Sequence, residues 1–166
     1  VDEDQIVEKD IVSGIAYSRN EAKVTLTGIA DRPGLAAMVF GPLAGAGVNV
    51  DMIVQSASHD GKSADITFTV GTDDIERALS VLGEEREGLG FEEILSDSDV
   101  VKVSVIGVGM RTHAGVARTM FETLSDKGIN IQVISTSEIK ISVLIAEEYT
   151  ELALRSLHAA YGLDAD

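Results

Sequence analysis

The sequence predicts an α+β protein built from two copies of one ferredoxin-like domain, each with the element order βαββαβ. A repeat is the first observation. The segment 22–29 (AKVTLTGI) aligns with 101–108 (VKVSVIGV), and 47–50 (GVNV) aligns with 128–131 (GINI). The offsets are 79 and 81 residues, which is too long for a solenoid unit and typical of a duplicated domain. The second observation is that alternating β-branched segments and helical segments follow one another in the same order in both copies.

The first copy contains four predicted strands and two predicted helices. The strands are expected at 22–30, 48–58, 63–70 and 91–95. Pro33 opens a helix over 33–46, which glycines end. Residues 59–62 (HDGK) predict a hairpin turn, and Thr72 is expected to cap a second helix over 72–88.

The second copy lacks a fourth strand of its own. Its strands are expected at 100–108, 129–136 and 139–146, and its helices at 114–127 and 148–161. Residues 11–17 (IVSGIAY) form a strand pattern with no place in the first copy. Because an open sheet edge is a liability, this strand is predicted to complete the second sheet. The first domain is then inserted in the second. The predicted divisions are a flexible acidic N-terminus, 1–10; the completing strand, 11–18; the first domain, 19–98; and the second domain, 99–166.

Composition excludes several classes of function. The net charge of −15 repels phosphate backbones, so no nucleic-acid partner is expected. The absence of cysteine excludes disulfides, thiolate-bound metals and a thiol nucleophile, and it is compatible with a cytoplasmic protein. No apolar run reaches the roughly 18 residues of a membrane span, so no membrane partner is expected. The chain begins at Val1 rather than Met, which is compatible with a piece of a longer protein.

The turn between the first strand and helix, 28–36 (GIADRPGLA), is a candidate amino-acid site. Unpaired N–H groups at a helix start attract a carboxylate, and Gly34 permits close approach. Asp31 is placed to meet an ammonium group, and Gln55 on the next strand can bond a side-chain hydroxyl. The alternative is purely structural: Asp31 caps the helix, Pro33 starts it, and Gly34 is incidental.

Other constellations give weaker signals. The turn 107–115 (GVGMRTHAG) lacks the glycine spacing of a dinucleotide site and is either a capping turn or a second anion site. Residues 135–138 (STSE) form either a hairpin turn or the rim of a ligand site. The three histidines are scattered and show no metal-ligand spacing. No catalytic or metal-binding residue is therefore predicted, and the chain is interpreted as a binding module.

Two segments carry a family resemblance. Residues 25–34 (TLTGIADRPG) resemble the first ACT domain of aspartate kinases, and 128–143 (GINIQVISTSEIKISV) resemble the second, with ISTSEI as the most specific part. The early Lys-Phe-Gly-Gly loop, with which the family's catalytic region binds ATP, does not occur in this sequence. The chain thus resembles the regulatory part of an aspartokinase, either a β subunit or an excised fragment. It is expected to be inactive alone and to hold no cofactor, since ATP and Mg belong to the kinase domain.

The resemblance implies feedback control of aspartate phosphorylation in lysine, threonine and methionine biosynthesis. In the family, the first ACT domain of one chain pairs with the second of its partner in a homodimer, next to the catalytic region. Threonine, with lysine as the second candidate, binds at that interface. By position, the first effector site comprises Asp31, Gly34, Leu35, Ala36, Gln55 and Thr67, with Asn130 and Ile131 from the partner.

A second effector site is implied at the equivalent position. It comprises Met110, His113, Gly115 and Val116, facing Asn49, Val50 and Asp51, with Ser137 and Glu138 available to read a lysine side chain. Met110 or Arg111 stands where the first loop has Asp31, so equal occupancy of the two sites is not expected. Two alternatives stay open. One is a stand-alone amino-acid sensor or the small subunit of another biosynthetic enzyme, and the other is an enzyme on a ferredoxin-like fold.

Overall fold

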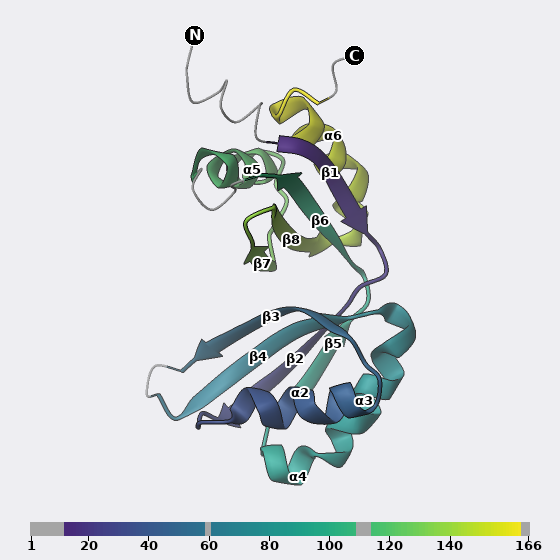
Figure 1. Ribbon diagram of the computed structural model, residues 1–166, viewed down its shortest axis with the longest axis vertical. Coiled ribbons are helices and arrows are strands. Elements are labelled where there is room, and N and C mark those ends of the chain that lie inside the picture. The colour runs from purple at the N-terminus through teal and green to yellow at the C-terminus, as the bar shows by residue number, and fades with distance from the viewer. Residues whose placement is uncertain (1–11, 59–60, 109–113, 164–166) are drawn as a thin grey trace. The chain divides into compact units, whose positions relative to one another are not determined.

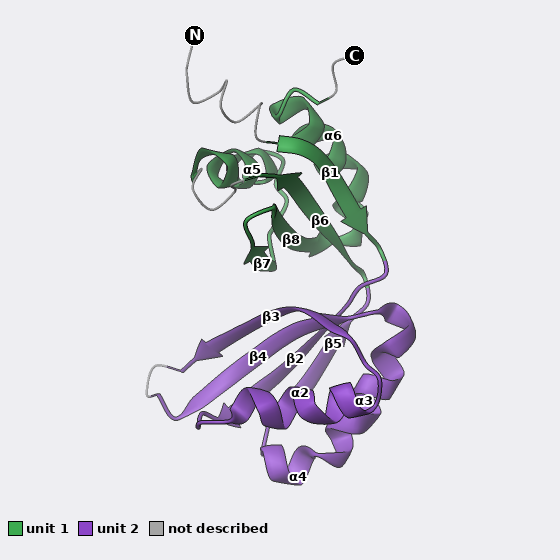
Figure 2. Ribbon diagram, viewed as in Figure 1, with its two compact units in different colours: residues 1–19, 99–166 green, residues 20–98 purple. Residues whose placement is uncertain are grey.

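The computed structural model describes residues 12–58, 61–108 and 114–163, and its chain divides into two compact units. Unit 1 consists of residues 1–19 and 99–166, and unit 2 of residues 20–98 (Figure 2). Each unit has its own four-stranded sheet and its own hydrophobic core. The terminus 1–10, expected to be flexible, lies outside the described residues.

Unit 2 is a split-βαβ sandwich. Its elements are β2 (Ala22–Ala30), α2 (Leu35–Gly45), β3 (Val50–Ala57), β4 (Ser63–Val70), the 3-10 turn η1 (Thr72–Asp74), α3 (Ile75–Glu84), α4 (Arg86–Leu89) and β5 (Glu93–Asp97). The sheet order is β3-β4-β2-β5, and all neighbours are antiparallel. Helices α2 and α3 cover one face of this sheet (Figure 1).

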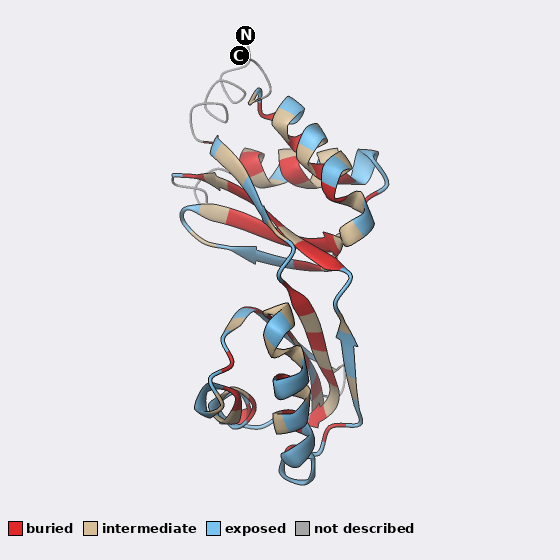
Figure 3. Ribbon diagram, turned by 90° about the vertical axis from the view of Figure 1, so that its right-hand side faces the viewer, coloured by how far each residue is buried: buried red, intermediate tan, exposed pale blue. Residues whose placement is uncertain are grey.

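The core of unit 2 follows from the two periodicities of its elements. Alternate residues of β4 point at the helices, and α2 presents every fourth residue to the sheet. These buried residues are Ala64, Ile66, Phe68 and Val70 from β4, and Leu35, Val39 and Leu43 from α2. Phe40 and Phe68 meet edge to face, with ring centroids 5.2 Å apart. Figure 3 shows the resulting buried stripes.

The second helix of unit 2 differs from the prediction. The expected helix 72–88 is divided into η1, α3 and α4. Thr72 does not cap α3. The residue before α3 is Asp74, which makes no side-chain capping bond, while the Thr72 N–H and hydroxyl both donate to Asn20 Oδ1 at 2.9 and 2.5 Å. Because Asn20, which is distant in the sequence, accepts the hydrogen bonds of Thr72, the prediction that Thr72 caps the helix was wrong.

Unit 1 repeats this architecture with a strand from the N-terminal segment. Its elements are β1 (Val12–Ser18), β6 (Val100–Gly107), α5 (Ala114–Asp126), β7 (Val133–Thr136), β8 (Lys140–Ala146), η3 (Glu147–Tyr149) and α6 (Thr150–Ala160). The sheet order is β1-β6-β8-β7. Strand β1 pairs antiparallel with β6, from Val12 opposite Gly107 to Ser18 opposite Lys102. The predicted fold class, including the inserted first domain, is confirmed.

The repeated Gly-hydrophobic-Asn-hydrophobic motif is a helix stop. Gly47 and Gly128 both have left-handed φ angles, 78° and 73°. In unit 2 the N–H of Val48 bonds the carbonyl of Leu43 at 2.9 Å, and Ile129 bonds Leu124 in the same way in unit 1. A bond of this kind, between residues that share one apolar core, is typical of a Schellman motif. In unit 1 the next strand, β7, begins at residue 133 rather than at the expected 129.

A second structural repeat lies in the sheets. The Thr25 and Thr67 hydroxyls are 3.1 Å apart on paired positions of β2 and β4. The Ser104 and Ser142 hydroxyls are 2.7 Å apart on paired positions of β6 and β8. Thr25 and Ser104 are separated by the same 79 residues as the sequence repeat. These two hydroxyl pairs therefore fix which residues of the two units are equivalent.

Candidate functional site

The turn between β2 and α2 leaves the start of the helix without a side-chain cap. The N-cap residue is Gly34, with φ 86° and ψ 1°, and no side chain bonds the first turn. The Leu35 N–H donates to Arg32 O at 3.2 Å. Within the part of the chain that the structure describes, no hydrogen bond occupies the N–H groups of Ala36 and Ala37. A helix start with unpaired donors is suited to an anion such as a carboxylate.

Gly34 is required in this turn by its backbone conformation. A residue with a Cβ is strained at a φ of 86°. A Cβ built at Gly34 would meet nothing within 4 Å, so the space above the turn is open. The interpretation of Gly34 as incidental is therefore wrong, and so is the expectation that Asp31 caps the helix.

Asp31 instead lies exposed at the open side of the turn. Its backbone N–H donates to Lys62 O at 3.1 Å, which ties the turn to the start of β4. The next side chain, Arg32, donates from Nη2 to Gly88 O at 3.0 Å and ties the turn to α4. Among the described residues, the Asp31 carboxylate makes no hydrogen bond or ion pair. The carboxylate is therefore available to a cation from outside.

The other residues of the first predicted site divide into two groups. Leu35 is 2% exposed and belongs to the core, so only its backbone faces the turn, whereas Ala36 is exposed. Gln55 is exposed on the edge strand β3 and pairs with Ile66, whose side chain points at the helices, so Gln55 shares the helix-covered face. Thr67 lies on the opposite face, where it bonds Thr25. The structure does not bring Thr67 to the side of the turn.

Asn130 and Ile131 lie in the connection between α5 and β7 of unit 1. Asn130 is exposed, and Ile131 packs partly buried against the unit 1 core. Their equivalents in unit 2 are Asn49 and Val50 at the start of β3, with the same pattern of one exposed and one half-buried residue. Asp51 follows on β3 and is exposed.

The second predicted site is described only in part. Met110 and His113 lie outside the described residues. Gly115 and Val116 stand in the first turn of α5, where Val116 is buried and its carbonyl accepts a hydrogen bond of 2.5 Å from the Tyr161 hydroxyl. These contacts fix the first turn of α5 against the end of α6.

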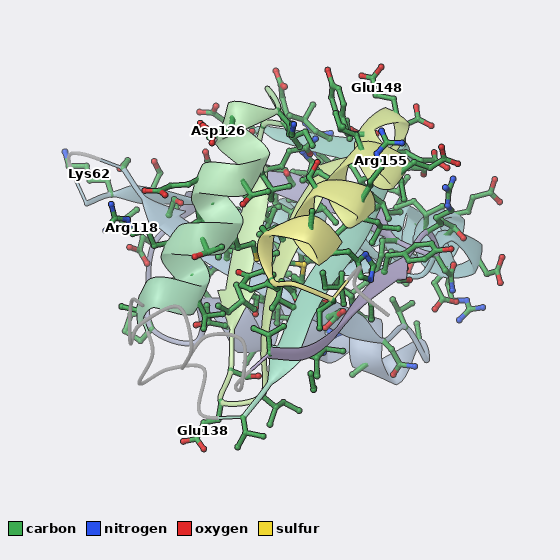
Figure 4. The ribbon with its side chains drawn as sticks, turned by 90° about the horizontal axis from the view of Figure 1, so that it is seen from above. Lys62, Arg118, Asp126, Glu138, Glu148 and Arg155 are labelled. Carbon is green, nitrogen blue, oxygen red and sulfur yellow. The ribbon has the colours of Figure 1, made fainter. Side chains whose placement is uncertain are left out.

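The segment 135–138 belongs to the hairpin between β7 and β8. Ser135 and Thr136 end β7, and the Ser137 N–H donates to Lys140 O at 2.8 Å. The Glu138 side chain extends away from the ribbon at the tip of this hairpin (Figure 4). Glu138 is therefore accessible to a ligand or to another chain, while Ser137 serves the turn.

Both sheets leave one edge strand that carries an exposed isoleucine. β3 ends the unit 2 sheet with Ile53 at 51% exposure, and β7 ends the unit 1 sheet with Ile134 at 44%. Open strand edges with apolar side chains are surfaces on which another strand can pair.

Neither metal binding nor membrane insertion is indicated in the described part of the chain. Its His, Asp and Glu residues form no group of three that could hold a metal ion. None of its helices combines the length and apolar character needed to cross a membrane. The features of the turn that suit a ligand are the uncapped start of α2 and the exposed Asp31 carboxylate.

Comparisons with known proteins identify the family of the chain. The ACT-domain family model matches residues 24–85 and 103–161. An aspartate kinase from Pseudomonas putida is 50% identical over 165 residues, which are 99% of this chain and 40% of the relative. The chain thus spans about 40% of the length of the curated relatives it matches.

Two solved structures are similar over nearly the whole chain. The ligand-free regulatory subunit of aspartate kinase from Thermus thermophilus has a TM-score of 0.86 and 40% identity, covering 90% of this chain and 98% of that one. A structure of aspartokinase alpha and beta subunits has a TM-score of 0.85 and 46% identity, covering 91% of this chain and 99% of the other.

Proposed function

This chain belongs to the ACT-domain family as the regulatory portion of an aspartate kinase, and from this identity we propose that it is the feedback sensor of that enzyme. It binds threonine, with lysine as the second candidate, and binding lowers the rate of aspartate phosphorylation. The chain supplies no catalytic residue and is inactive alone. ATP and Mg bind the kinase region, which is its partner in the cytoplasm.

The arrangement at the β2–α2 turn carries the proposal. An α-amino acid presents a carboxylate and an ammonium group a few ångströms apart. The N–H groups of Ala36 and Ala37 suit the carboxylate, and the exposed Asp31 suits the ammonium group. The exposure of Gln55 on the helix-covered face of the edge strand supports its proposed role as the partner of a side-chain hydroxyl such as that of threonine.

The proposed assembly is a homodimer in which unit 2 of one chain pairs with unit 1 of the other. The open edges of β3 and β7, with exposed Ile53 and Ile134, support this pairing. Asn130 and Ile131 of the partner would then complete the first effector site. The second site, around Gly115 and Val116, lacks an acid in the position of Asp31 and is expected to bind more weakly.

The effector acts by shifting an equilibrium between an active and an inhibited arrangement of the kinase regions. It can shift that equilibrium only by the difference between its affinities for the two states. Contacts that exist only in the inhibited arrangement, such as those from the partner chain, supply this difference.

Isothermal titration of the purified chain with L-threonine and then L-lysine tests the proposal, with the molecular mass measured before and after. We expect threonine to bind to a dimer. In that dimer, where the partner covers the turn, Asp31→Ala removes a charge-assisted hydrogen bond worth about 1.5–3 kcal/mol, so affinity should fall by about 10- to 150-fold without unfolding. Asp73→Ala, which removes an exposed carboxylate elsewhere in unit 2, is the control and should bind normally.

Two outcomes would contradict the proposal at different points. Unchanged affinity in Asp31→Ala would remove Asp31 from the site while leaving the sensor function intact. No heat of binding from either amino acid would show that the effector chemistry is wrong for this chain.

A further inference from the structure

Strand β2 contains a bulge just before the β2–α2 turn, residues 31–34, which is called the effector turn because the proposed effector site lies there. Leu26 pairs with Ile66 and Ile29 pairs with Ala64, so two residues of β2 face the single residue Asp65 of β4. Gly28, the second of the two, has a left-handed φ of 65°. Its N–H donates to Asp65 Oδ1 at 3.0 Å. A glycine in this conformation is typical of strand bulges, which bend the strand and change the direction in which it continues.

The other side of Gly28 is also occupied. A Cβ at this position would lie 2.7 Å from the Glu92 side chain, and the Glu92 N–H donates to Thr27 O at 2.8 Å. The bulge is thus held between Glu92, the residue before β5, and the Asp65 carboxylate. Only two residues, Ile29 and Ala30, separate it from Asp31.

The equivalent position in unit 1 is built differently. Because Thr67 corresponds to Ser142, Asp65 corresponds to Lys140, and Gly28 corresponds to Gly107. The β6–β8 ladder runs from Val100 to Ile106 without a register shift. The Gly107 N–H donates to a backbone oxygen, that of Ile139, at 2.8 Å. A lysine side chain has no acceptor, so it could not replace the Asp65 carboxylate.

We propose that Asp65 is a positioning residue for the effector turn of unit 2. Its carboxylate fixes the bulge at Gly28, and the bulge sets the direction in which the chain continues. That direction determines the positions of Asp31 and of the first N–H groups of α2. The inference rests on the proposed function for the identity of the ligand. It extends that function by giving a positioning role to a residue outside the predicted site. It also gives a structural difference between the turn of unit 2 and the equivalent turn of unit 1.

The expected effect follows from population arithmetic. When the binding-competent turn is one state among several, the apparent affinity falls in proportion to its population. Without an acceptor at position 65, the Gly28 N–H bonds to water instead, and the conformation of the bulge is no longer fixed. A fall of the competent fraction to about one tenth weakens threonine binding about tenfold, which is about 1.4 kcal/mol.

The test uses Asp65→Ala, Asp65→Asn and the control Asp73→Ala, each in the full 166-residue chain. Two readouts are taken: hydrogen exchange of peptides covering residues 26–37, and titration with L-threonine. Asp65→Ala should exchange faster in this segment and bind about tenfold more weakly. Asp65→Asn keeps an oxygen acceptor at the same place, so both readouts should stay within about threefold of wild type. A general destabilisation would instead raise exchange throughout unit 2, residues 20–98, and not only in this segment.

Hydrogen exchange tests the positioning role of Asp65 even when no ligand binds. Unchanged exchange of 26–37 in Asp65→Ala overturns it, and so does faster exchange with unchanged threonine affinity. When wild type binds neither threonine nor lysine, the proposed function fails. Faster exchange confined to this segment would still support the positioning role of Asp65.

Discussion

Two glycine-to-alanine substitutions at opposite ends of α2 should change stability in opposite directions. Gly34, the N-cap, has a φ of 86°, whereas Gly45, the last residue of the helix, has a negative φ. At both positions the added methyl group meets nothing within 4 Å. Neither variant therefore introduces a steric clash with a neighbouring residue, and the two variants differ only in the backbone conformation at the substituted position.

The magnitudes follow from that difference. An L-residue held in the left-handed region costs about 1–2 kcal/mol, so Gly34→Ala should be destabilising by that amount. Gly45→Ala restricts the unfolded chain at a compatible site and should be stabilising by about 0.4–1 kcal/mol. The two variants should therefore differ by about 1.5–3 kcal/mol. With a urea m-value of about 1.5 kcal/mol/M, their unfolding midpoints should be separated by about 1–2 M.

Equilibrium urea unfolding of the two variants and wild type, followed by a probe in unit 2, measures this separation. Gly34→Asn provides an internal check, because asparagine tolerates the left-handed region better than alanine and should lose less stability. Midpoints that move in the same direction for Gly34→Ala and Gly45→Ala would refute the assignment of Gly34 as a left-handed N-cap. Since the same residue shapes the effector turn, Gly34→Ala should also weaken threonine binding.

Two further predictions concern the separate cores. Phe68→Ala removes a fully buried ring that contacts Phe40 and should be destabilising by about 3–5 kcal/mol. Hydrogen exchange should rise throughout 20–98, while β6 and β8 of unit 1 stay protected. Loss of protection in both units would contradict the independence of the cores. Tyr161→Phe removes the hydroxyl that bonds Val116 O and should be destabilising by about 0.5–1.5 kcal/mol in urea unfolding of unit 1. Tyr17→Phe, at a side chain 53% exposed, is its control and should have little effect.

Much of the fold could be predicted because the relevant signals are local. Alternation identified the strands, and the repeated GVNV and GINI segments marked the C-terminal ends of α2 and α5. The structure shows a Schellman motif at each of these ends, with Gly47 and Gly128 in the left-handed conformation. The incomplete second copy indicated that the N-terminal strand pairs with β6, and it does. Each of these inferences depends on neighbours in sequence or on the count of strands in a sheet.

The errors arose where a distant residue decides the local structure. Thr72 was expected to cap a helix, but Asn20, which is 52 residues earlier, accepts its hydrogen bonds. Asp65, the proposed positioning residue, gave no signal in the sequence, because its contact with Gly28 depends on a register shift between β2 and β4. Thr67 is different. Its apolar neighbours Ile66 and Phe68 already indicated by alternation that it faces away from the helices.

The energetics of the proposed effector contacts explain why a sensor of this kind would need a second chain. Shifting a two-state equilibrium from 1:99 to 99:1 requires about 5.5 kcal/mol of differential affinity. Asp31 is exposed in unit 2, and an exposed charge pair is worth only about 0–1 kcal/mol. The same pair becomes stronger when another surface excludes water from it. The turn of unit 2 alone would therefore bind an amino acid weakly and equally in both states. In the proposed homodimer, regulation would require the partner surface around Asn130 to cover the turn in one state and to leave it open in the other.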